Sequence, residues 1–403
     1  FQHSVEMHSR LGMTVNQGTV LLTGRARTPE ERLDAVRLAW QANGVREVIN
    51  EIVVDDASTL GDSTRDTWIS TQLRGKLLFD REVSSINYSI ETVNGVVDLM
   101  GNARDPAELD RILRDGPGFR MGPFELFDLT GLDVSHAVME SVYQQFYQDP
   151  RYTPSYQAAQ RVAAGLLGRK SGQGYYRYDN GQQMRTPAPA LEPVPVDRPF
   201  WLDSQDAELR GWLAALLGQT GAQLESGETP SERAICLITP LGEDASSMIA
   251  RLGLPAARCV AYDLFSDRER RHVLMRTPAL DPALEAQARQ ALGGDGVPVE
   301  VINDSPGFVS QRVVASIVNL GCEIAQKGIA DPHTLDRAIT LALGYPKGPL
   351  GFAEHYGAAR VLAILEAMQA CYGGEARYRP SPWLRRRVQL ALPLSAPERG
   401  SAP

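Results

Sequence analysis

Two internal repeats constrain the fold of this chain more than any other feature of its sequence. The longer repeat has an offset of 226 in residue number and runs without a gap from residue 105 to residue 162. It pairs Asp105-Pro106 with Asp331-Pro332, Leu109-Asp110 with Leu335-Asp336, Gly118 with Gly344, Gly122-Pro123 with Gly348-Pro349, and Arg161-Val162 with Arg387-Val388. Agreement over this length without a change of spacing predicts two copies of one structural unit in a single chain.

The shorter repeat has an offset of 77 in residue number and relates 18–31 to 95–108. The two repeats overlap at 105–111, and each of them breaks off there. We therefore hypothesise that two unrelated units are joined near 104–112, either by recombination or by an error of gene assembly. Sequencing the source DNA across this point distinguishes the two origins.

The first unit of the shorter repeat has the pattern strand, helix, strand. Val20 and Leu22 alternate with threonines, which is typical of a strand with one buried face. Thr28 precedes Pro29 and is the expected N-cap of the helix, which a capping box supports. We expect a hairpin turn at 17–18, the end of the helix at residue 44 and a second strand at 47–54.

The second half of the chain shows a different organisation. Residues 181–199 are rich in proline and predict a stiff, extended linker. After the linker, apolar runs at 234–238, 259–262 and 297–302 alternate with amphipathic segments such as 284–292, which predicts a parallel α/β sheet. We expect the tail from residue 393 to be disordered.

The composition argues against several classes of function. A net charge of −8 leaves no excess of lysine or arginine to neutralise phosphates, so we expect no nucleic-acid partner. The six histidines and four cysteines show no ligand spacing, so we expect no metal site. No apolar run approaches the ~20 residues that a membrane-spanning helix needs. We expect a cytoplasmic protein, and a periplasmic or envelope protein if a leader sequence precedes Phe1.

Residues 105–178 resemble the C-terminal domain of the 3-hydroxyacyl-CoA dehydrogenase family. The resemblance is carried by the run 118–126, by Asp128 and Asp133, and by the run 167–176. A second copy at 305–388 resembles the same domain in longer bacterial members of the kind found in phenylacetate degradation. In that family the domain is a helical bundle that packs against an NAD-binding domain, shapes the acyl-CoA cleft and supplies the dimer contact. The resemblance implies β-oxidation chemistry, with NAD as the family's cofactor and acyl-CoA as its substrate class.

The family's reaction moves a hydride from C3 of the substrate to NAD, while a histidine held by a glutamate accepts the hydroxyl proton and an asparagine completes the site. In the second copy, Asp263 stands at the place of the histidine, Arg276 near that of the glutamate, and Gln311 at that of the asparagine. No GxGxxG run occurs in a strand-turn-helix setting. We therefore expect that the isolated chain binds no cofactor, has no intact catalytic residue and lacks dehydrogenase activity.

Residues 1–104 resemble BON domains. The resemblance is carried by the run 24–27, by the capped helix and by the run 48–50. Members of that family are mostly periplasmic or envelope proteins, and attachment to phospholipid has been proposed for them. The resemblance implies an alternative function, an envelope module with a passenger dehydrogenase fragment, in which residues 1–104 contact a membrane surface.

Together these features predict a multidomain chain of α/β and all-α units. The expected parts are an α+β BON-like domain at 1–55, a partial second BON-like unit at 65–104, a first helical domain at 105–180 that is truncated at its start, a linker at 181–199, a degenerate Rossmann-like domain at 200–302, a second helical domain at 303–392, and a tail at 393–403.

Several residues of the helical domains are candidates for contacts with substrate or another subunit. They are Phe119 and the two turns at Gly122-Pro123 and Gly348-Pro349, whose first role is to fix a sharp bend between helices. The expected partner is a second copy of the chain or another subunit of the family, bound through the helical domains.

Arg169 and Lys170 lie in a glycine-rich run that follows a helix, so we interpret this run as a surface turn, with a contact to a CoA phosphate as the alternative. Because the first copy lacks its first helix, we also expect the apolar faces of Leu126, Val138 and Val142 to be partly uncovered.

Overall fold

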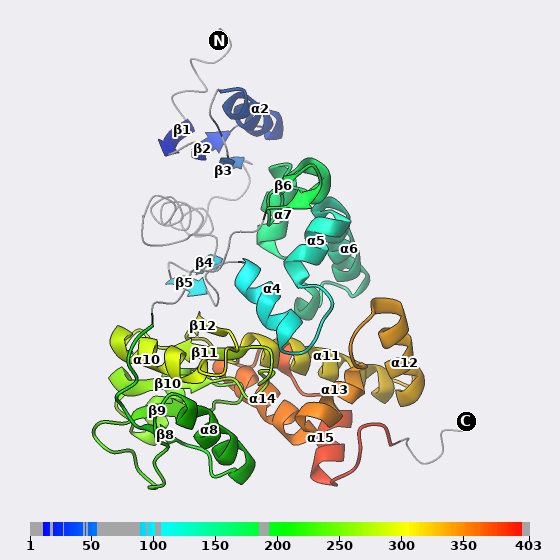
Figure 1. The fold of residues 1–403 in the computed structure, drawn as a ribbon. Helices are drawn as coiled ribbons and strands as arrows, with labels where there is room; N and C mark the ends of the chain where they lie inside the picture. The colour runs from blue at the N-terminus through cyan, green and yellow to red at the C-terminus, as the bar shows by residue number, and fades with distance from the viewer. Residues whose placement is uncertain are drawn as a thin grey trace.

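The computed structural model describes residues 11–16, 19–26, 28–42, 45, 47–54, 89–93, 96–100, 106–184 and 193–396. Its first elements are β1 (Leu11–Asn16), β2 (Thr19–Ala26), α2 (Pro29–Trp40) and β3 (Glu47–Val54), seen at the top of Figure 1. β1 pairs with β2 in the antiparallel sense, and β3 pairs with β2 in the parallel sense. Val20 and Leu22 of β2 are buried beneath α2, and Thr28 caps this helix through the backbone N–H of Glu31. The predicted strands and N-cap are confirmed, and the expected turn at 17–18 lies outside the described residues. The expected helix end at residue 44 is wrong, because α2 ends at Trp40 with Gln41 as its C-cap.

A second hairpin, formed by β4 (Ser89–Val93) and β5 (Val96–Met100), repeats the first one. Gly12 lies opposite Thr23 in β1–β2, and Ser89 lies opposite Met100 in β4–β5, so both partners are related by the offset of 77. The shorter repeat is therefore a repeat of strand register as well as of sequence. The rest of the expected unit at 65–104, and the start of the proposed junction, lie outside the described residues.

The α/β domain is built on a five-stranded sheet with the order β12-β11-β10-β9-β8. Its elements are β8 (Phe200–Leu202), α8 (Ala207–Gln219), β9 (Ile235–Ile238), α9 (Ala245–Leu252), η4 (Ala256–Arg258), β10 (Cys259–Tyr262), β11 (His272–Arg276), α10 (Pro282–Leu292) and β12 (Val299–Asn303). Helices α8 and α10 cover one face of the sheet, while α9 and part of a helix from the first helical domain cover the other.

The expectation of a wholly parallel sheet is wrong. β8, β9 and β10 are parallel to one another, but β11 runs antiparallel to β10. The physical reason is the short connection at 263–271, because a parallel pair needs a crossover of a dozen or more residues. The sheet is thus mixed, and β12 pairs in parallel with β11 at its edge.

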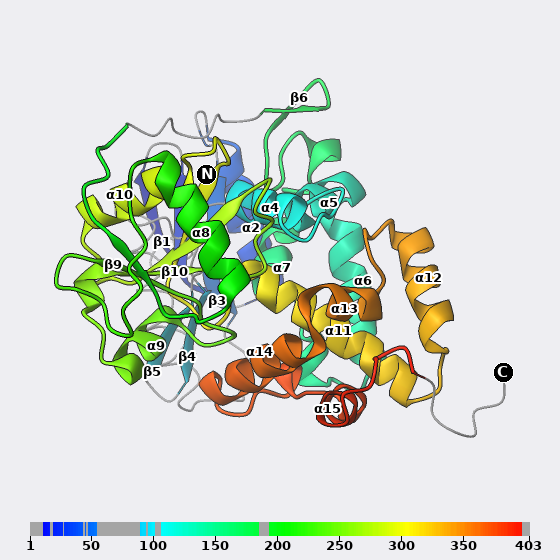
Figure 2. The same cartoon turned by 60° about the horizontal axis from the view of Figure 1, so that its bottom comes forward.

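The second helical domain, called copy 2 below, surrounds one long central helix. Its elements are α11 (Val309–Gln326), α12 (Pro332–Leu343), α13 (Pro349–Tyr356), α14 (Ala358–Cys371), η5 (Ala376–Tyr378) and α15 (Pro382–Gln389). Val314, Val318 and Cys322 of α11 are fully buried against α13, α14 and α15. Figure 2 shows α11 in yellow next to α13 and α14.

The tail after α15 is ordered where the structure describes it. Leu394 is buried in the core of copy 2, and the indole N–H of Trp383 donates to its carbonyl oxygen over 3.0 Å. The expectation of a disordered tail from residue 393 is therefore wrong for residues 393–396, because an apolar side chain returns to the domain. Residues 397–403 lie outside the described part of the chain.

The first helical domain, called copy 1, repeats the part of copy 2 that runs from α12 to α15. Its elements are α4 (Pro106–Asp115), α5 (Pro123–Thr130), α6 (Leu132–Gln145), η2 (Pro150–Tyr152) and α7 (Tyr156–Ala163), followed by η3 (Arg169–Ser171), β6 (Tyr178–Asp179) and β7 (Gln182–Gln183). The bounds of α5, α6, η2 and α7 coincide with those of α13, α14, η5 and α15 after the offset of 226. The counterpart of α11 would occupy 83–100, and the described residues of this stretch, 89–93 and 96–100, form the strands β4 and β5 instead.

The two copies pack against each other around an approximate two-fold axis. Figure 1 shows α4 of copy 1 lying on α11 of copy 2, and η2 contacts its own counterpart η5. No helix in the described part of the chain is long and apolar enough to cross a bilayer.

Candidate functional site

Asp263 and Gln311 form a closed hydrogen-bonded pair at the contact between the α/β domain and α11. Asp263 directly follows β10, and Gln311 lies in the first turn of α11. Gln311 Nε2 donates to Asp263 Oδ1 over 3.0 Å and to the carbonyl oxygen of Pro240 over 3.1 Å. Gln311 Oε1 accepts a hydrogen bond from the backbone N–H of Gly242. In the sequence, Asp263, Arg276 and Gln311 stand where the family has its catalytic residues. The structure brings Asp263 and Gln311 together.

The pair is sealed from solvent, which changes the chemistry of the carboxyl group. Both side chains are fully buried. Loss of solvation raises the pKa of Asp263 to about 7, and hydrogen bonds from Phe265 N–H and Gln311 offset only part of this effect. Asp263 Oδ2 has no hydrogen-bond partner among the described residues. A carboxyl group enclosed in this way is not placed to accept a proton from the hydroxyl of a substrate.

Arg276 lies apart from this pair. It ends β11, where its guanidinium donates to Asn303 Oδ1 over 3.1 and 3.2 Å and lies 3.5 Å from Glu285 Oε2. The register of the sheet sets Arg276 opposite Val260, three residues before Asp263. The third predicted position therefore takes part in a separate polar cluster.

The helix N-termini that follow the parallel strands do not fit a dinucleotide. A pyrophosphate binds where a glycine turn leaves the backbone N–H groups of a helix N-terminus free. At α8 the carboxylate of Asp206 caps the helix by accepting from Leu209 N–H over 3.0 Å. At α9 Asp304 Oδ1 accepts from Ala245 N–H over 2.8 Å, and Asp244 Oδ1 accepts from Ser247 N–H over 2.7 Å. These carboxylates would repel the phosphates that the family's cofactor brings.

The two Gly-Pro turns have equivalent structural roles in the two copies. Asp110 of α4 accepts hydrogen bonds from the backbone N–H groups of Phe124 and Glu125 at the start of α5. A Cβ atom on Gly122 would overlap the Asp110 carboxyl group, so only glycine permits this approach. Pro123 occupies the first turn of α5, where its missing N–H is not needed.

Copy 2 repeats this arrangement with Asp336 of α12, which accepts from Leu350 and Gly351 N–H over 2.8 and 2.7 Å. A Cβ atom on Gly348 would overlap that carboxyl group, and Pro349 is buried beside Gly321 of α11. The structure shows a packing role for both turns, and their contact with substrate or another subunit stays a prediction.

Phe119 lies at the contact between the copies. Its ring meets Tyr345 edge to face, with ring centroids 5.0 Å apart, and Phe352 at 5.7 Å. It thus makes an intramolecular contact, and the predicted contact with substrate is not tested by this placement.

The turn that carries Arg169 and Lys170 lies on the surface, as the sequence predicts for this segment. Lys170 Nζ lies 2.5 Å from Asp133 Oδ1, and Arg169 is exposed. Because its ammonium group already has a carboxylate partner, Lys170 is the weaker of the two candidates for a CoA phosphate. That contact stays a prediction for Arg169.

Sequence reasoning named Asp110 and Asp128 only as parts of the repeat and of the family resemblance, and it missed that their buried carboxylates hold copy 1 together. Asp128 accepts from the backbone N–H groups of Tyr175 and Tyr176, both over 2.8 Å, and anchors the glycine-rich turn to α5. The Tyr176 hydroxyl also donates to Asp110 over 2.5 Å. Burial raises the pKa of both aspartates. The signal was present for Asp110, since Leu109-Asp110 and Leu335-Asp336 are matched in the longer repeat.

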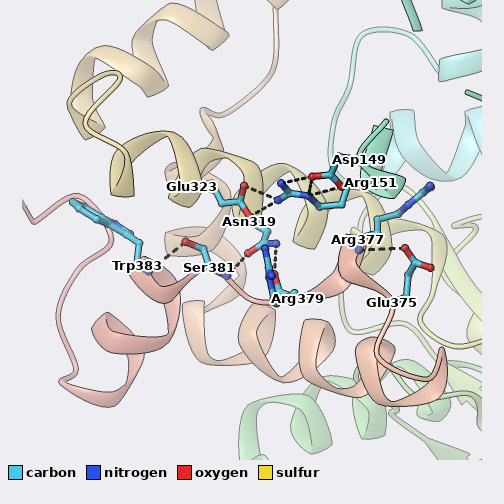
Figure 3. Close-up of polar contacts among 9 residues, drawn as sticks. All are labelled: Asp149, Arg151, Asn319, Glu323, Glu375, Arg377, Arg379, Ser381 and Trp383. Carbon is cyan, nitrogen blue, oxygen red and sulfur yellow. Dashed lines mark hydrogen bonds and ion pairs between the residues drawn. The ribbon is translucent and has the colours of Figure 1, made fainter. Parts of the chain in front are cut away.

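A polar seam at η2 also went unpredicted (Figure 3). Arg151 of copy 1 donates to both carboxylate oxygens of Glu323 in α11, over 2.7 and 2.8 Å, and is held by Asp149. Further along α11, Asn319 donates to the carbonyl oxygen of Arg379 and accepts from Ser381 N–H. The seam therefore joins copy 1, α11 and the loop before α15.

Known proteins resemble this chain along the same divisions. The family model described as 3-hydroxyacyl-CoA dehydrogenase, C-terminal domain, matches residues 88–178 and 307–398, and the BON domain model matches residues 4–56. The 3-hydroxyadipyl-CoA dehydrogenase of Escherichia coli (strain K12) is 33% identical over 292 residues, which are 71% of this chain and 54% of that protein. The chain therefore spans about half the length of that relative.

A solved structure supports the same relationship. The crystal structure of 3-hydroxybutyryl-CoA dehydrogenase from Escherichia coli K12 substr. MG1655 has a TM-score of 0.58 and 27% identity, and the match covers 94% of this chain and 70% of that chain. The probable 3-hydroxybutyryl-CoA dehydrogenase of Deinococcus radiodurans is 39% identical over 90 residues, 22% of this chain and 32% of that protein. Residues 88–178 and 307–398 are therefore two copies of the 3-hydroxyacyl-CoA dehydrogenase C-terminal domain, carried in one chain with a BON domain at residues 4–56.

Proposed function

We propose that this chain is a non-catalytic member of the 3-hydroxyacyl-CoA dehydrogenase family, which acts in acyl-CoA metabolism of the cytoplasm by binding other subunits through its helical domains. The observation that carries the proposal is the set of aspartates at the helix N-termini of the α/β domain. Asp206, Asp244 and Asp304 already bind the backbone N–H groups that a pyrophosphate would need. The buried Asp263–Gln311 pair supports it, since neither group faces a substrate.

The test measures NADH oxidation by the purified chain with acetoacetyl-CoA as the hydride acceptor. The control in the same assay is the Escherichia coli 3-hydroxyadipyl-CoA dehydrogenase, its relative. We expect no turnover above the rate without protein, and no heat of NAD binding by calorimetry. Turnover at a rate comparable to that of the control enzyme would falsify the proposal.

A double variant sharpens this test. Asp263→His with Gln311→Asn restores two residue types of the family's reaction while leaving the helix N-termini unchanged. We expect this variant to remain inactive, because the carboxylates of Asp206, Asp244 and Asp304 still repel the cofactor. A gain of activity would show that a dinucleotide does bind, and the argument from the helix N-termini would then be wrong.

The BON match at residues 4–56 favours one alternative, attachment to a membrane surface at the cell envelope. In support of it, β1, β2, α2 and β3 enclose a small core of their own. The alternative predicts that the full chain floats with vesicles of anionic phospholipid in a density gradient. Recovery of all protein in the dense fractions would count against the alternative.

A further inference from the structure

Copy 1 leaves uncovered an apolar surface that copy 2 buries. Leu126 of α5 and Val138 of α6 are 48% and 56% exposed, and Val142 is half-buried. Their counterparts after the offset of 226 are Phe352, Ile364 and Met368, and all three are fully buried in the core around α11. The surface formed by Leu126, Val138 and Val142 is called the open face below. The expectation of uncovered apolar side chains is confirmed for Leu126 and Val138.

Copy 2 shows what covers such a face. There α11 presents a stripe of small and branched apolar residues, including Val314, Val318 and Cys322, to α13 and α14. The approach is close, since a Cβ atom on Gly321 would lie 2.5 Å from the Pro349 side chain. In copy 1 the corresponding stretch holds the strands β4 and β5. An amphipathic helix of the same chemistry would therefore complete copy 1.

A second, polar observation points to the same occupant. In copy 2, Asn319 of α11 donates to Arg379 C=O over 2.9 Å and accepts from Ser381 N–H over 2.7 Å (Figure 3). The counterparts in copy 1 are the C=O of Thr153 and the N–H of Ser155, which have no partner in the described part of the chain. An asparagine in the same position of a docked helix would satisfy both groups.

Charge supplies a third observation. Across the two-fold axis, Arg151 of copy 1 pairs with Glu323 of α11, four residues after Asn319. Its counterpart in copy 2 is Arg377, whose guanidinium reaches the carbonyl oxygen of Pro150 and has no acidic partner among residues 106–184 and 193–396. By the same symmetry, an acidic side chain on a helix docked to copy 1 would lie beside Arg377. Arg377 is exposed and its guanidinium has no acidic partner in the described part of the chain, so it is the cation that such a side chain would meet.

We infer that the open face binds an amphipathic helix of a separate protein chain. The helix has small or branched apolar residues in the pattern of α11, an asparagine that bonds Thr153 and Ser155, and an acidic residue four positions later that pairs with Arg377. This goes beyond the proposed lack of catalysis, and a binding assay tests it whether or not the chain turns over substrate.

The probe is a fluorescent synthetic peptide with the sequence of residues 305–327, which contains α11, and the readout is fluorescence anisotropy with the full chain. We expect saturable binding that Val138→Asp weakens about tenfold or more, because a carboxylate would be buried against the peptide. Val138 is exposed, so this variant should keep its fold, and circular dichroism checks that it does. The matched control is Leu341→Asp, which changes an exposed leucine of α12 and should leave binding unchanged.

A charge exchange tests the orientation of the helix. Glu323→Lys in the peptide should weaken binding, and Arg377→Glu in the protein should restore it for this peptide while weakening the original one. A peptide of scrambled order controls for unspecific adsorption.

Absence of saturable binding, or binding that Val138→Asp leaves unchanged, would overturn the inference. Analytical ultracentrifugation of the chain alone tests whether a second copy of the chain binds the open face instead. If the chain dimerises and Val138→Asp makes it monomeric, then a second copy covers the open face and the proposed helix partner is wrong.

Discussion

Phe119 and Tyr345 occupy equivalent positions of the longer repeat and meet each other edge to face, with ring centroids 5.0 Å apart. The same symmetry governs the neighbouring residues. A Cβ atom on Gly118 would meet Pro346, and one on Gly344 would meet Arg120. These two contacts are equivalent, because the offset of 226 relates Gly118 to Gly344 and Arg120 to Pro346. The two copies thus use the same surface toward each other, as identical subunits of a symmetric dimer do.

Removal of the Phe119 ring should loosen this contact. We expect Phe119→Ala to lower the free energy of unfolding by about 2–4 kcal/mol, because the ring packs on both Tyr345 and Phe352. Urea denaturation followed by circular dichroism measures the change. Phe146→Ala is the control, since this ring is 49% exposed and packs on Tyr152 of its own copy, and it should cost less than about 1 kcal/mol. Equal losses in the two variants would contradict the role given to Phe119.

Substitutions at Gly348 and Asp336 should have non-additive effects on the free energy of unfolding. Gly348→Ala introduces a methyl group where the Asp336 carboxyl group lies, and Asp336→Ala removes the two hydrogen bonds that begin α13. We expect each single variant to lose about 1–3 kcal/mol of stability and the double variant to lose less than their sum. Additive losses in this cycle would mean that the two groups are not in contact.

Stability should depend on pH through Asp263. Its pKa in the folded chain is about 7, above its ordinary value of 3.8, so folding favours the protonated carboxyl group. The resulting stabilisation is complete below about pH 4 and is lost as the pH rises through 7, at up to about 1.4 kcal/mol per pH unit.

Asp263→Asn keeps the bond from Gln311 and cannot ionise, so its stability relative to the unchanged chain should increase between pH 4 and 8. Thermal unfolding at several pH values measures this difference. A difference that stays constant with pH would show that Asp263 does not titrate in this range.

The seam at Arg151 should contribute more than an ordinary surface ion pair. Arg151 and Glu323 are 18% and 14% exposed, so Arg151→Met leaves a largely buried carboxylate without its partner. We expect a loss of about 1–3 kcal/mol, measured by urea denaturation. The exposed pair of Arg385 and Glu366 is the matched control, and Arg385→Met should cost less than about 1 kcal/mol. Identical effects at the two sites would argue against a stabilising seam.

Much of the fold could be predicted because periodicity and repeats are local or exact signals. The strand at 259–262 is found at the predicted bounds, and the capping of α2 by Thr28 is confirmed. The direction of β11 could not be predicted, since its apolar residues are compatible with either pairing and only the length of the preceding loop decides between them. The burial of Leu394 depends on a contact with Trp383, which local composition does not encode.

The candidate site was predictable only as a set of positions. Sequence comparison with the family indicated Asp263, Arg276 and Gln311, but it could not show that Asp263 and Gln311 bond each other while Arg276 binds Asn303. The aspartates at helix N-termini were equally visible in the sequence. The sequence did not show that β8 and β9, the strands that precede Asp206 and Asp244, are parallel neighbours.

The hairpin β4–β5, which stands in the place of a central helix, gives the two copies different degrees of independence. Copy 2 encloses its own central helix α11. Copy 1 has no such helix among its described residues and packs against neighbours such as Phe352 and Glu323. Backbone amides of α6 should then exchange with deuterium sooner than those of α14, by openings that leave copy 2 intact. Unfolding of copy 2, in contrast, would remove the contacts on which copy 1 depends. We therefore expect copy 1 to unfold together with copy 2.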